Sequence, residues 1–287
     1  MSRRKLVAVL LLAVLAMAGV SYAQRFGGQG GGGRRRGGGR GGFGGGYYQI
    51  RRPDANSFTG DFTFCRLAYS QASDGDGGGW GVDYPRADQN LSIRISELTK
   101  AQVNFDSKHD PNFFVIQATD PELFQCPFVM VTEFGGTYFA PEEANALRDY
   151  MLKGGFLWAD DAWGTYAWQH WVGEVRKIFP SESEYPIIDV PLNHSMFHTL
   201  YDAKRFPQIP SINWVRSGTT SERGADSAVP MPRAILDKKG RIIFFMSHNT
   251  DFGDAYEREG DDPTYFYTFS VEGYAIGIDV VLYAMTH

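Results

Sequence analysis

The sequence predicts one α/β domain in which a mostly parallel sheet is covered by helices on both faces. Two observations support this prediction. Between residues 62 and 284, short continuous apolar segments, which are typical of strands buried on both faces, alternate with stretches in which apolar residues recur every three or four positions. Residues 58–287 are also enough for one sizeable core and too few for two typical domains, and they contain no internal repeat.

The strands and helices can be assigned in chain order. We expect strands at residues 62–69, 113–117, 128–132 and 156–159, helices at 88–103, 141–154, 168–179 and 274–284, and a hairpin at 233–246. The helix that begins at Pro141 has the clearest boundaries, because Glu142 and Glu143 lie in its first turn and Gly154 ends it. The hairpin turns at residues 237–240.

Residues 1–23 have the three parts of a signal peptide. Basic residues at 3–5 precede an uninterrupted run of apolar and small residues at 6–20, and residues 21–23 have the small–x–small pattern that signal peptidase reads. A helix of this run rises about 22 Å, short of the ~30 Å hydrocarbon core of a bilayer. Cleavage after Ala23, and a secreted or periplasmic location, are therefore favoured over an uncleaved anchor, and we expect no later membrane span.

Residues 24–57 are expected to form a disordered linker. Between Gly27 and Gly46 there are 14 glycines, interspersed with arginines, and such a stretch cannot bury enough apolar area to offset its chain entropy. Arginine–glycine runs also bind RNA or anionic surfaces. For an exported chain, an acidic envelope polymer is the more plausible of these partners.

The charge of residues 58–287 argues against nucleic acid as a partner. All 33 acidic residues lie after residue 52, together with 18 of the 28 Lys and Arg residues, which gives residues 53–287 a net charge of −15, and residues 58–287, without Asp54, a net charge of −14. A nucleic-acid-binding domain needs a basic face to meet phosphates. Cys65 and Cys126 are the only cysteines, and they form either one disulfide or two separately buried thiols.

Polar residues follow four of the predicted strands. The first strand leads into a glycine-rich loop at residues 77–85, and the others lead into Glu133, into Asp160–Asp161 and into residues 247–251. Ligands bind outside the carboxyl ends of strands in open α/β sheets. We therefore expect a cleft at this edge, with ligand-binding residues Trp80, Asp83, Tyr84, Glu133, Trp163, Asn249 and Asp254.

Asp160, Asp161, His248 and Asp251 are the candidate catalytic residues. Adjacent residues of an extended chain point opposite ways, so one of the two aspartates faces the cleft and the other has a structural role. His248 with Asp251, Asp254 and Glu257 would form a base-and-carboxylate set, a hydrated cation site or a solvated acidic loop.

His194 and His198 are candidate metal ligands on the rim of this cleft. Their spacing of four residues would put both on one helical face. The zinc-protease glutamate that often accompanies such a pair is missing, and Phe197 indicates that part of this turn is packed in the core.

Several stretches together resemble the bacterial domain-of-unknown-function family 4159. They are residues 81–85 with 87–91, 120–123 with Pro127–Phe128, 147–161, 194–198, 248–254 and 283–287. The resemblance covers about residues 60–287. It implies a flavodoxin-like sheet of the class I glutamine amidotransferase-like superfamily, alongside the trehalose-utilisation-type proteins. Amidotransferases place a cysteine at the sharp turn where this chain has Ala159-Asp160-Asp161, so glutaminase chemistry is not expected.

The sequence leaves three classes of function open. The first is an exported protein that binds a small polar ligand, for instance a carbohydrate, since aromatic faces stack on sugar rings and carboxylates accept hydroxyl hydrogen bonds. The second is an envelope hydrolase that uses Asp160 or Asp161 with His248 and a metal at His194 and His198. The third is a non-catalytic partner of other envelope proteins. The sequence specifies no cofactor.

Overall fold

The computed structural model of the chain describes residues 49–287, so the predicted signal peptide and most of the predicted linker lie outside the described residues. The main sheet has seven strands in the order β3-β1-β4-β6-β9-β8-β7. These are β1 (Phe64–Ala68), β3 (Phe113–Gln117), β4 (Val129–Thr132), β6 (Leu157–Ala162), β7 (Ile188–Asp189), β8 (Met231–Leu236) and β9 (Ile242–His248). The first five strands in this order pair in parallel, and β8 and β7 pair antiparallel. The mostly parallel α/β sheet is therefore confirmed.

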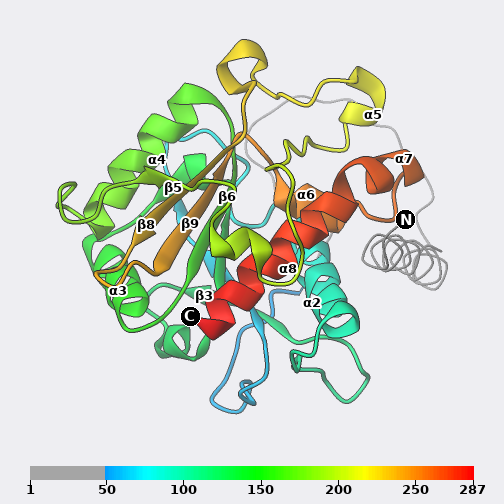
Figure 1. Cartoon of the computed structure of the whole chain (residues 1–287). Coiled ribbons are helices and arrows are strands. Elements are labelled where there is room, and N and C mark those ends of the chain that lie inside the picture. The colour runs from blue at the N-terminus through cyan, green and yellow to red at the C-terminus, as the bar shows by residue number, and fades with distance from the viewer. Residues whose placement is uncertain (1–48) are drawn as a thin grey trace.

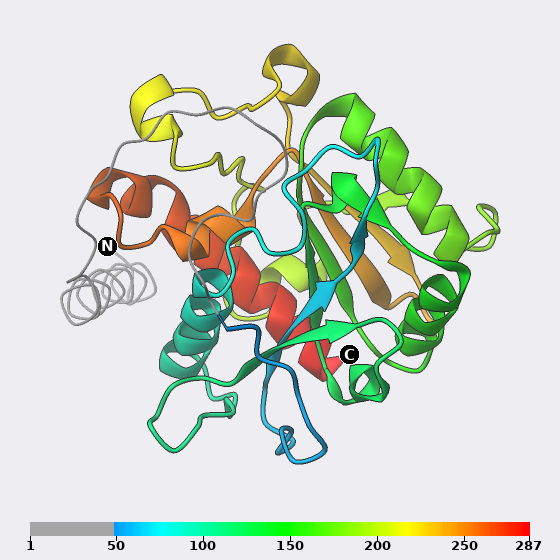
Figure 2. The ribbon, with the colours of Figure 1, turned by 180° about the vertical axis from the view of Figure 1, so that it is seen from behind.

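Helices cover both faces of the sheet (Figures 1 and 2). On one face lie α2 (Arg86–Leu98), α6 (Phe252–Glu257) and α8 (Val271–Thr286), and on the other lie α3 (Pro141–Leu152) and α4 (Gly164–Ile178). Strand β1 shows why a continuous apolar run is needed. Phe64 packs into the core beneath α2 and α8, whereas Cys65 and Leu67 pack into the core beneath α3 and α4.

Short elements connect the layers. Strands β2 (Ser70–Gln71) and β5 (Thr137–Tyr138) form an antiparallel ribbon. Single turns are formed by η1 (Pro121–Gln125), η2 (Phe134–Gly136), η3 (Ser195–His198), α5 (Trp214–Ser217), η4 (Gly224–Ser227) and α7 (Pro263–Tyr265), and a π-helical turn, η5 (Phe266–Ser270), leads into α8.

The predicted elements exist, but several of their ends differ. The most informative difference is in β6, which we expected to end at Ala159 and which continues to Ala162. It continues because Asp160 pairs with Ser247 and Ala162 pairs with His248 in β9, across a register shift at Asp161. The predicted helix 88–103 starts earlier and ends at Leu98, and α4 begins at Gly164 rather than at residue 168.

The last part of the predicted linker lies against the domain. The backbone N–H of Val115 in β3 donates a hydrogen bond to the carbonyl of Arg51 (2.8 Å), and the N–H of Arg51 donates to the Tyr84 hydroxyl (3.2 Å). The ordered domain therefore includes residues that the sequence assigned to the linker. The signal peptide and residues 24–48 stay predictions.

Two further features of the described residues are a disulfide and one long apolar helical segment. Cys65 and Cys126 form a disulfide that ties β1 to the segment before β4, which decides between the two alternatives left open by the sequence. Among the described residues, one helical segment, Pro263–Thr286, is long and apolar enough to cross a membrane. The most apolar part of that segment is 61% buried inside the domain, as in a core helix.

Candidate functional site

Four residues at the carboxyl edge of the sheet have left-handed backbone conformations. Asp83 lies in the loop after β2, and Glu133, Asp161 and Asn249 lie at the ends of β4, β6 and β9, with φ values of 63°, 54°, 62° and 62°. A non-glycine residue in this region costs about 1–3 kcal/mol, and such residues concentrate at functional sites. Only one other described non-glycine residue, His109, has a positive φ. Local strain is therefore concentrated at this edge.

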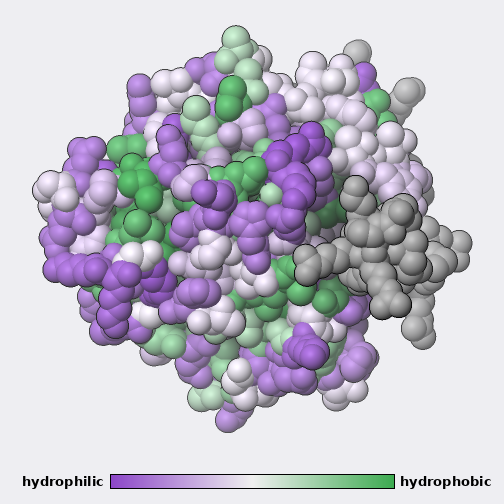
Figure 3. Space-filling view, in the orientation of Figure 1, coloured by the Kyte–Doolittle hydropathy of each residue, from purple (hydrophilic) through white to green (hydrophobic). Residues whose placement is uncertain are grey.

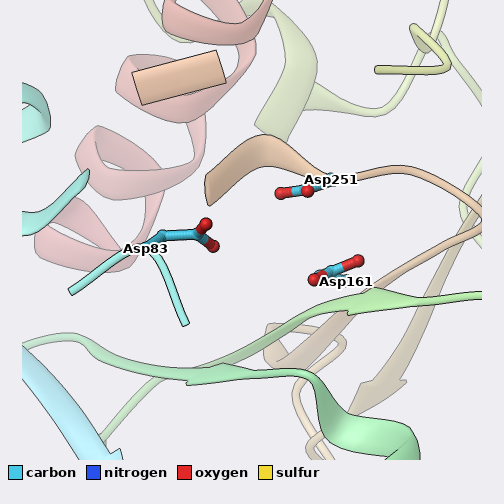
Figure 4. A group of neighbouring side chains, drawn as sticks. All are labelled: Asp83, Asp161 and Asp251. Carbon is cyan, nitrogen blue, oxygen red and sulfur yellow. The ribbon is translucent and has the colours of Figure 1, made fainter. Parts of the chain in front are cut away.

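Asp83, Asp161 and Asp251 converge there from three separate segments. Each contributes a carboxylate oxygen to a group whose members lie within 4.8 Å of one another. Figure 4 shows the three side chains directed toward a common space between the loop after β2, the end of β6 and the start of α6. Their exposed fractions are 6%, 5% and 4%, so the carboxylates are buried. We call these three residues the acidic cluster.

The loop that carries Asp83 is held by a buried arginine of β1. The Arg66 guanidinium donates hydrogen bonds to the carbonyls of Val82 (2.9 Å) and Trp80 (3.2 Å). Arg66 also forms a fully buried ion pair with Asp88 of α2, through Nε at 3.0 Å and through Nη2. This pairing fixes the guanidinium, so Arg66 anchors the loop through Val82 and Trp80, and it acts on Asp83 only through a longer-range attraction that opposes the rise in the pKa of Asp83.

The other two members of the cluster are fixed by neutral donors. The Trp163 indole N–H donates to Asp161 Oδ1 (2.7 Å). The backbone N–H of Asp254 donates to Asp251 Oδ1 (2.7 Å), so Asp251 caps the start of α6. By contrast, no N–H or O–H of the described residues donates to Asp83 Oδ2, although this atom is buried.

The neighbouring carboxylates Asp160 and Asp161 have different surroundings. Asp160 is fully buried and accepts hydrogen bonds from the Ser247 hydroxyl and from the backbone N–H of Gly253 (2.9 Å). It therefore ties β6 to β9 and α6, while Asp161 belongs to the acidic cluster.

Burial is the main influence on the pKa values of the carboxyl groups in this region. It raises the pKa of Asp83, Asp161 and Asp251 well above the usual range, and repulsion between neighbouring carboxylates raises it further. Burial also raises the pKa of Glu133 and of Asp160 to about 7, against the opposing effect of hydrogen-bond donors. Since these carboxylates are charged only at a cost, the site favours a proton or another cation.

A polar cavity of about 240 Å³ opens beside the acidic cluster. Its walls come from the glycine-rich loop, the ends of β4 and β6, and the segment before η4. The lining residues are Asp76, Gly77, Gly78, Glu133, Asp161, Ala162, Trp163, Glu222 and Arg223. Gly77 lies close to Glu133, since a β-carbon at position 77 would lie 2.7 Å from Glu133 Oε2 and 3.1 Å from the Glu133 carbonyl oxygen.

Several predicted ligand-binding residues have structural roles. Tyr84 is buried, and its hydroxyl donates to the carbonyl of Gln49 (3.2 Å). Trp80 packs edge-on against Tyr84. The Asn249 amide connects two loops: it accepts from the Gly164 N–H and donates to the Val229 carbonyl, each at 2.8 Å. Asp254 accepts from Arg258 and from the Ile212 N–H.

His248 is close to the site in the backbone but does not belong to the acidic cluster. Its ring stacks on Trp168 of α4 with centroids 4.9 Å apart, and its Nε2 lies 3.1 Å from the Gly164 carbonyl. Side chains alternate along β9, so Ser247 contacts Asp160 while His248 packs against α4. Burial lowers the pKa of His248 to about 4. The expected pairing of His248 with Asp251 is therefore wrong.

The expectation that His194 and His198 lie on the rim of this site is also wrong. His194 lines a second cavity together with Gly154 and the turn at residues 237–240, which precede β6 and β9 and so lie at the opposite, amino edge of the sheet. The segment forms the short turn η3 rather than an α-helix. His194 Nδ1 accepts the Met196 N–H, and His198 contacts the Leu192 carbonyl and Asp202.

Sequence reasoning missed Arg66 and the residues Asp76, Glu222 and Arg223 of the cavity wall. The sequence contains an indication that Arg66 has a special role, because Arg66 is a charged residue inside an otherwise apolar buried strand. For Glu222 and Arg223 it contains none: they lie in a long segment without periodicity, and only the fold brings Arg223 to Asp76 (2.9 Å).

These features define an α/β domain with a buried acidic site at the carboxyl edge of its sheet. The chain belongs to the family described as domain of unknown function DUF4159, whose sequence pattern matches residues 63–285. A comparison with curated proteins gave no match.

Proposed function

We propose that this domain binds a small polar ligand, such as a sugar, in the cavity beside the acidic cluster, and that it does so outside the cytoplasm. The observation that carries the proposal is the position of the cavity. The direction in which strands are added to the sheet reverses between β1 and β4, and the cavity is lined by residues that follow these strands, such as Gly77 and Glu133. Ligands of open α/β sheets bind at such switch points.

The lining of the cavity suits a ligand rich in hydroxyl groups. The carboxylates of Glu133 and Glu222 accept hydrogen bonds, the Arg223 guanidinium donates them, and Trp163 also lines the cavity. The volume of about 240 Å³ is below the ~300–1,000 Å³ typical of sites for drug-sized ligands. A single sugar ring therefore fits this cavity better than a long polymer segment.

Export is supported by the leader pattern of residues 1–23 and by the disulfide between Cys65 and Cys126, because disulfides persist in oxidising compartments. The expected superfamily also has support. Numbered in chain order, the five parallel strands follow the order 2-1-3-4-5, which is that of flavodoxin-like sheets.

The two alternatives have less support. A hydrolase that used His248 as its base would need that ring beside Asp161, and the ring packs against Trp168 instead. A broad exposed apolar face is one mark of a protein-binding site. The face shown in Figure 3 is mainly hydrophilic, with apolar residues in separate small groups.

The proposal can be tested by thermal shift and calorimetry on the full chain. The panel would contain neutral monosaccharides, amino sugars and uronic acids, each with a chelator and again with millimolar Ca²⁺ and Mg²⁺. We expect at least one sugar to bind, and Glu133→Gln to weaken its binding by about tenfold, which corresponds to the loss of one hydrogen bond to a charged group. Glu142→Gln, on the exposed surface of α3, should leave the affinity unchanged. Absence of binding across the panel would refute the proposal.

A further inference from the structure

We propose that Asp83, Asp161 and Asp251 hold a hard divalent cation, Mg²⁺ or Ca²⁺, beside the ligand cavity. The inference goes beyond the proposed ligand and does not depend on it. Three observations support it. The carboxylate oxygens have a suitable spacing, one carboxylate oxygen of Asp83 has no hydrogen-bond partner among the described residues, and the nearby arginines form ion pairs with other carboxylates.

The spacing of the three carboxylates fits one coordination sphere. One oxygen from each lies within 4.8 Å of the other two. Oxygen ligands lie at about 2.0–2.1 Å from Mg²⁺ and about 2.3–2.6 Å from Ca²⁺. Ligands on opposite sides of such an ion are therefore separated by about 4–5 Å, and adjacent ligands by less. Because all three ligands are carboxylate oxygens, they select hard cations rather than Zn²⁺ or Cu²⁺.

The unpartnered oxygen of Asp83 is an independent indication. The side chain is 6% exposed, and its Oδ2 accepts no hydrogen bond from any described residue. A buried polar atom without a partner costs about 1–3 kcal/mol, and more when it is charged. Figure 4 shows the Asp83 carboxylate directed toward Asp161 and Asp251. A cation bound between the three residues would supply the missing partner.

Among the described residues, each of the nearby arginines forms an ion pair with a carboxylate outside the acidic cluster. Arg66 pairs with Asp88, and Arg223 pairs with Asp76. Arg258 contacts Asp254 (3.2 Å) and Glu257 (2.8 Å).

This distribution also decides between two possible ligand sets. Asp83 lies within reach of a second group, formed with Asp254 and Glu257. That group already has the Arg258 guanidinium in contact, whereas no arginine of the described residues forms an ion pair with the acidic cluster. The cation therefore belongs to Asp83, Asp161 and Asp251.

The three ligands are positioned before a cation arrives. Asp161 is held by the Trp163 indole, and Asp251 is held by the first turn of α6. Asp83 is placed by the carbonyls that Arg66 binds on either side of Gly81. Contacts of this kind, which orient the ligands without touching the ion, typically contribute one to two orders of magnitude to metal affinity.

The first test is a titration of the full chain, stripped with a chelator, in a buffer without sugars. We expect calorimetry to show one Ca²⁺ or Mg²⁺ bound per chain, and the melting temperature to rise with cation concentration, as it does for any ligand that binds only the folded state. If neither ion binds at millimolar concentration, the inference is wrong.

Asp83→Asn provides the second test. It should weaken cation binding by about tenfold or more, while the melting temperature of the stripped protein stays equal or rises, because a buried charge has been removed. Asp279→Asn is the matched control, since Asp279 is also fully buried with an unpartnered Oδ2 but lies outside the acidic cluster. Its cation affinity should equal that of the wild type. Unchanged binding by Asp83→Asn would overturn the assignment.

Asp161→Asn is the second variant if Asp83→Asn does not fold, and the same results are expected of it. The result of the cation titration can be distinguished from the result of the sugar-binding test of the proposed function. Cation binding without any sugar binding would sustain this inference and refute the proposed function, and sugar binding without a cation would do the reverse.

Discussion

The carboxylate of Asp83 lies directly against the backbone of Gly253. A β-carbon added at Gly253 would come within 2.2 Å of Asp83 Oδ2 and 3.3 Å of Asp251 Oδ1. The N–H of the same glycine donates to Asp160. The first turn of α6 therefore packs directly against the acidic cluster, and a side chain at position 253 would overlap the Asp83 carboxylate.

Gly253→Ala should consequently destabilise the protein although alanine favours helices. We expect a loss of about 1–3 kcal/mol from overpacking, together with weaker cation binding, because the Asp83 carboxylate must move. Gly173→Ala is the matched control: it lies in α4 with nothing within 4 Å of the added carbon, and should gain about 0.5–1 kcal/mol. Urea unfolding measures both. Equal effects of the two substitutions would contradict the close contact at Gly253.

Glu133 should make the cation-free protein less stable as the pH rises. Burial raises the pKa of Glu133 in the folded state to about 7, from a usual value of 4.5. Between these two values the folded state holds more protons than the unfolded state, so the free energy of unfolding falls with increasing pH. Glu133→Gln removes this effect and should be more stable than the wild type at pH 8, with little difference below pH 4.5. Chemical denaturation at several pH values with a chelator present measures the difference, and a difference between the two proteins that does not vary with pH would contradict the burial of Glu133.

His248 should make the free energy of unfolding rise with increasing pH, opposite to the effect of Glu133. Burial lowers its pKa in the folded state to about 4, from 6.5. Between these values the unfolded state holds more protons, so this stabilising contribution is complete above pH 6.5 and is lost as the pH falls toward 4. The difference in unfolding free energy between the wild type and His248→Gln should shrink by up to about 3 kcal/mol across this window. A difference that does not vary with pH would mean that the ring is not buried as a neutral group.

The sequence predicts the parallel sheet, its covering helices and the edge at which the candidate site lies, because each of these depends on local patterns. It does not predict which polar residues meet. Asp83 and Asp251 were correctly placed at the same edge of the sheet, but the commitment of Asp160 to Ser247 and Gly253 depends on the pairing of β6 with β9.

Left-handed backbone conformations explain part of what the sequence does not predict about side-chain directions. Simple alternation along β6 would decide the direction of Asp161, but its φ of 62° turns the chain at that point. His248 illustrates the reverse case: it follows regular alternation along β9 and therefore points away from the acidic cluster toward Trp168. Composition alone does not distinguish these two cases.

The buried pair of Arg66 and Asp88 gives the last prediction, because it separates stability from cation binding. Arg66→Met leaves Asp88 as an unpaired buried carboxylate and should cost about 3–5 kcal/mol. The double variant Arg66→Met with Asp88→Leu removes both charges and should recover most of this loss, since buried ion pairs are often replaceable by apolar residues. Cation affinity should not recover, because the carbonyls of Trp80 and Val82 still lack the guanidinium that holds the Asp83 loop. Urea unfolding and calcium titration of both variants measure the two effects, and a double variant with wild-type affinity would show that Arg66 does not position Asp83.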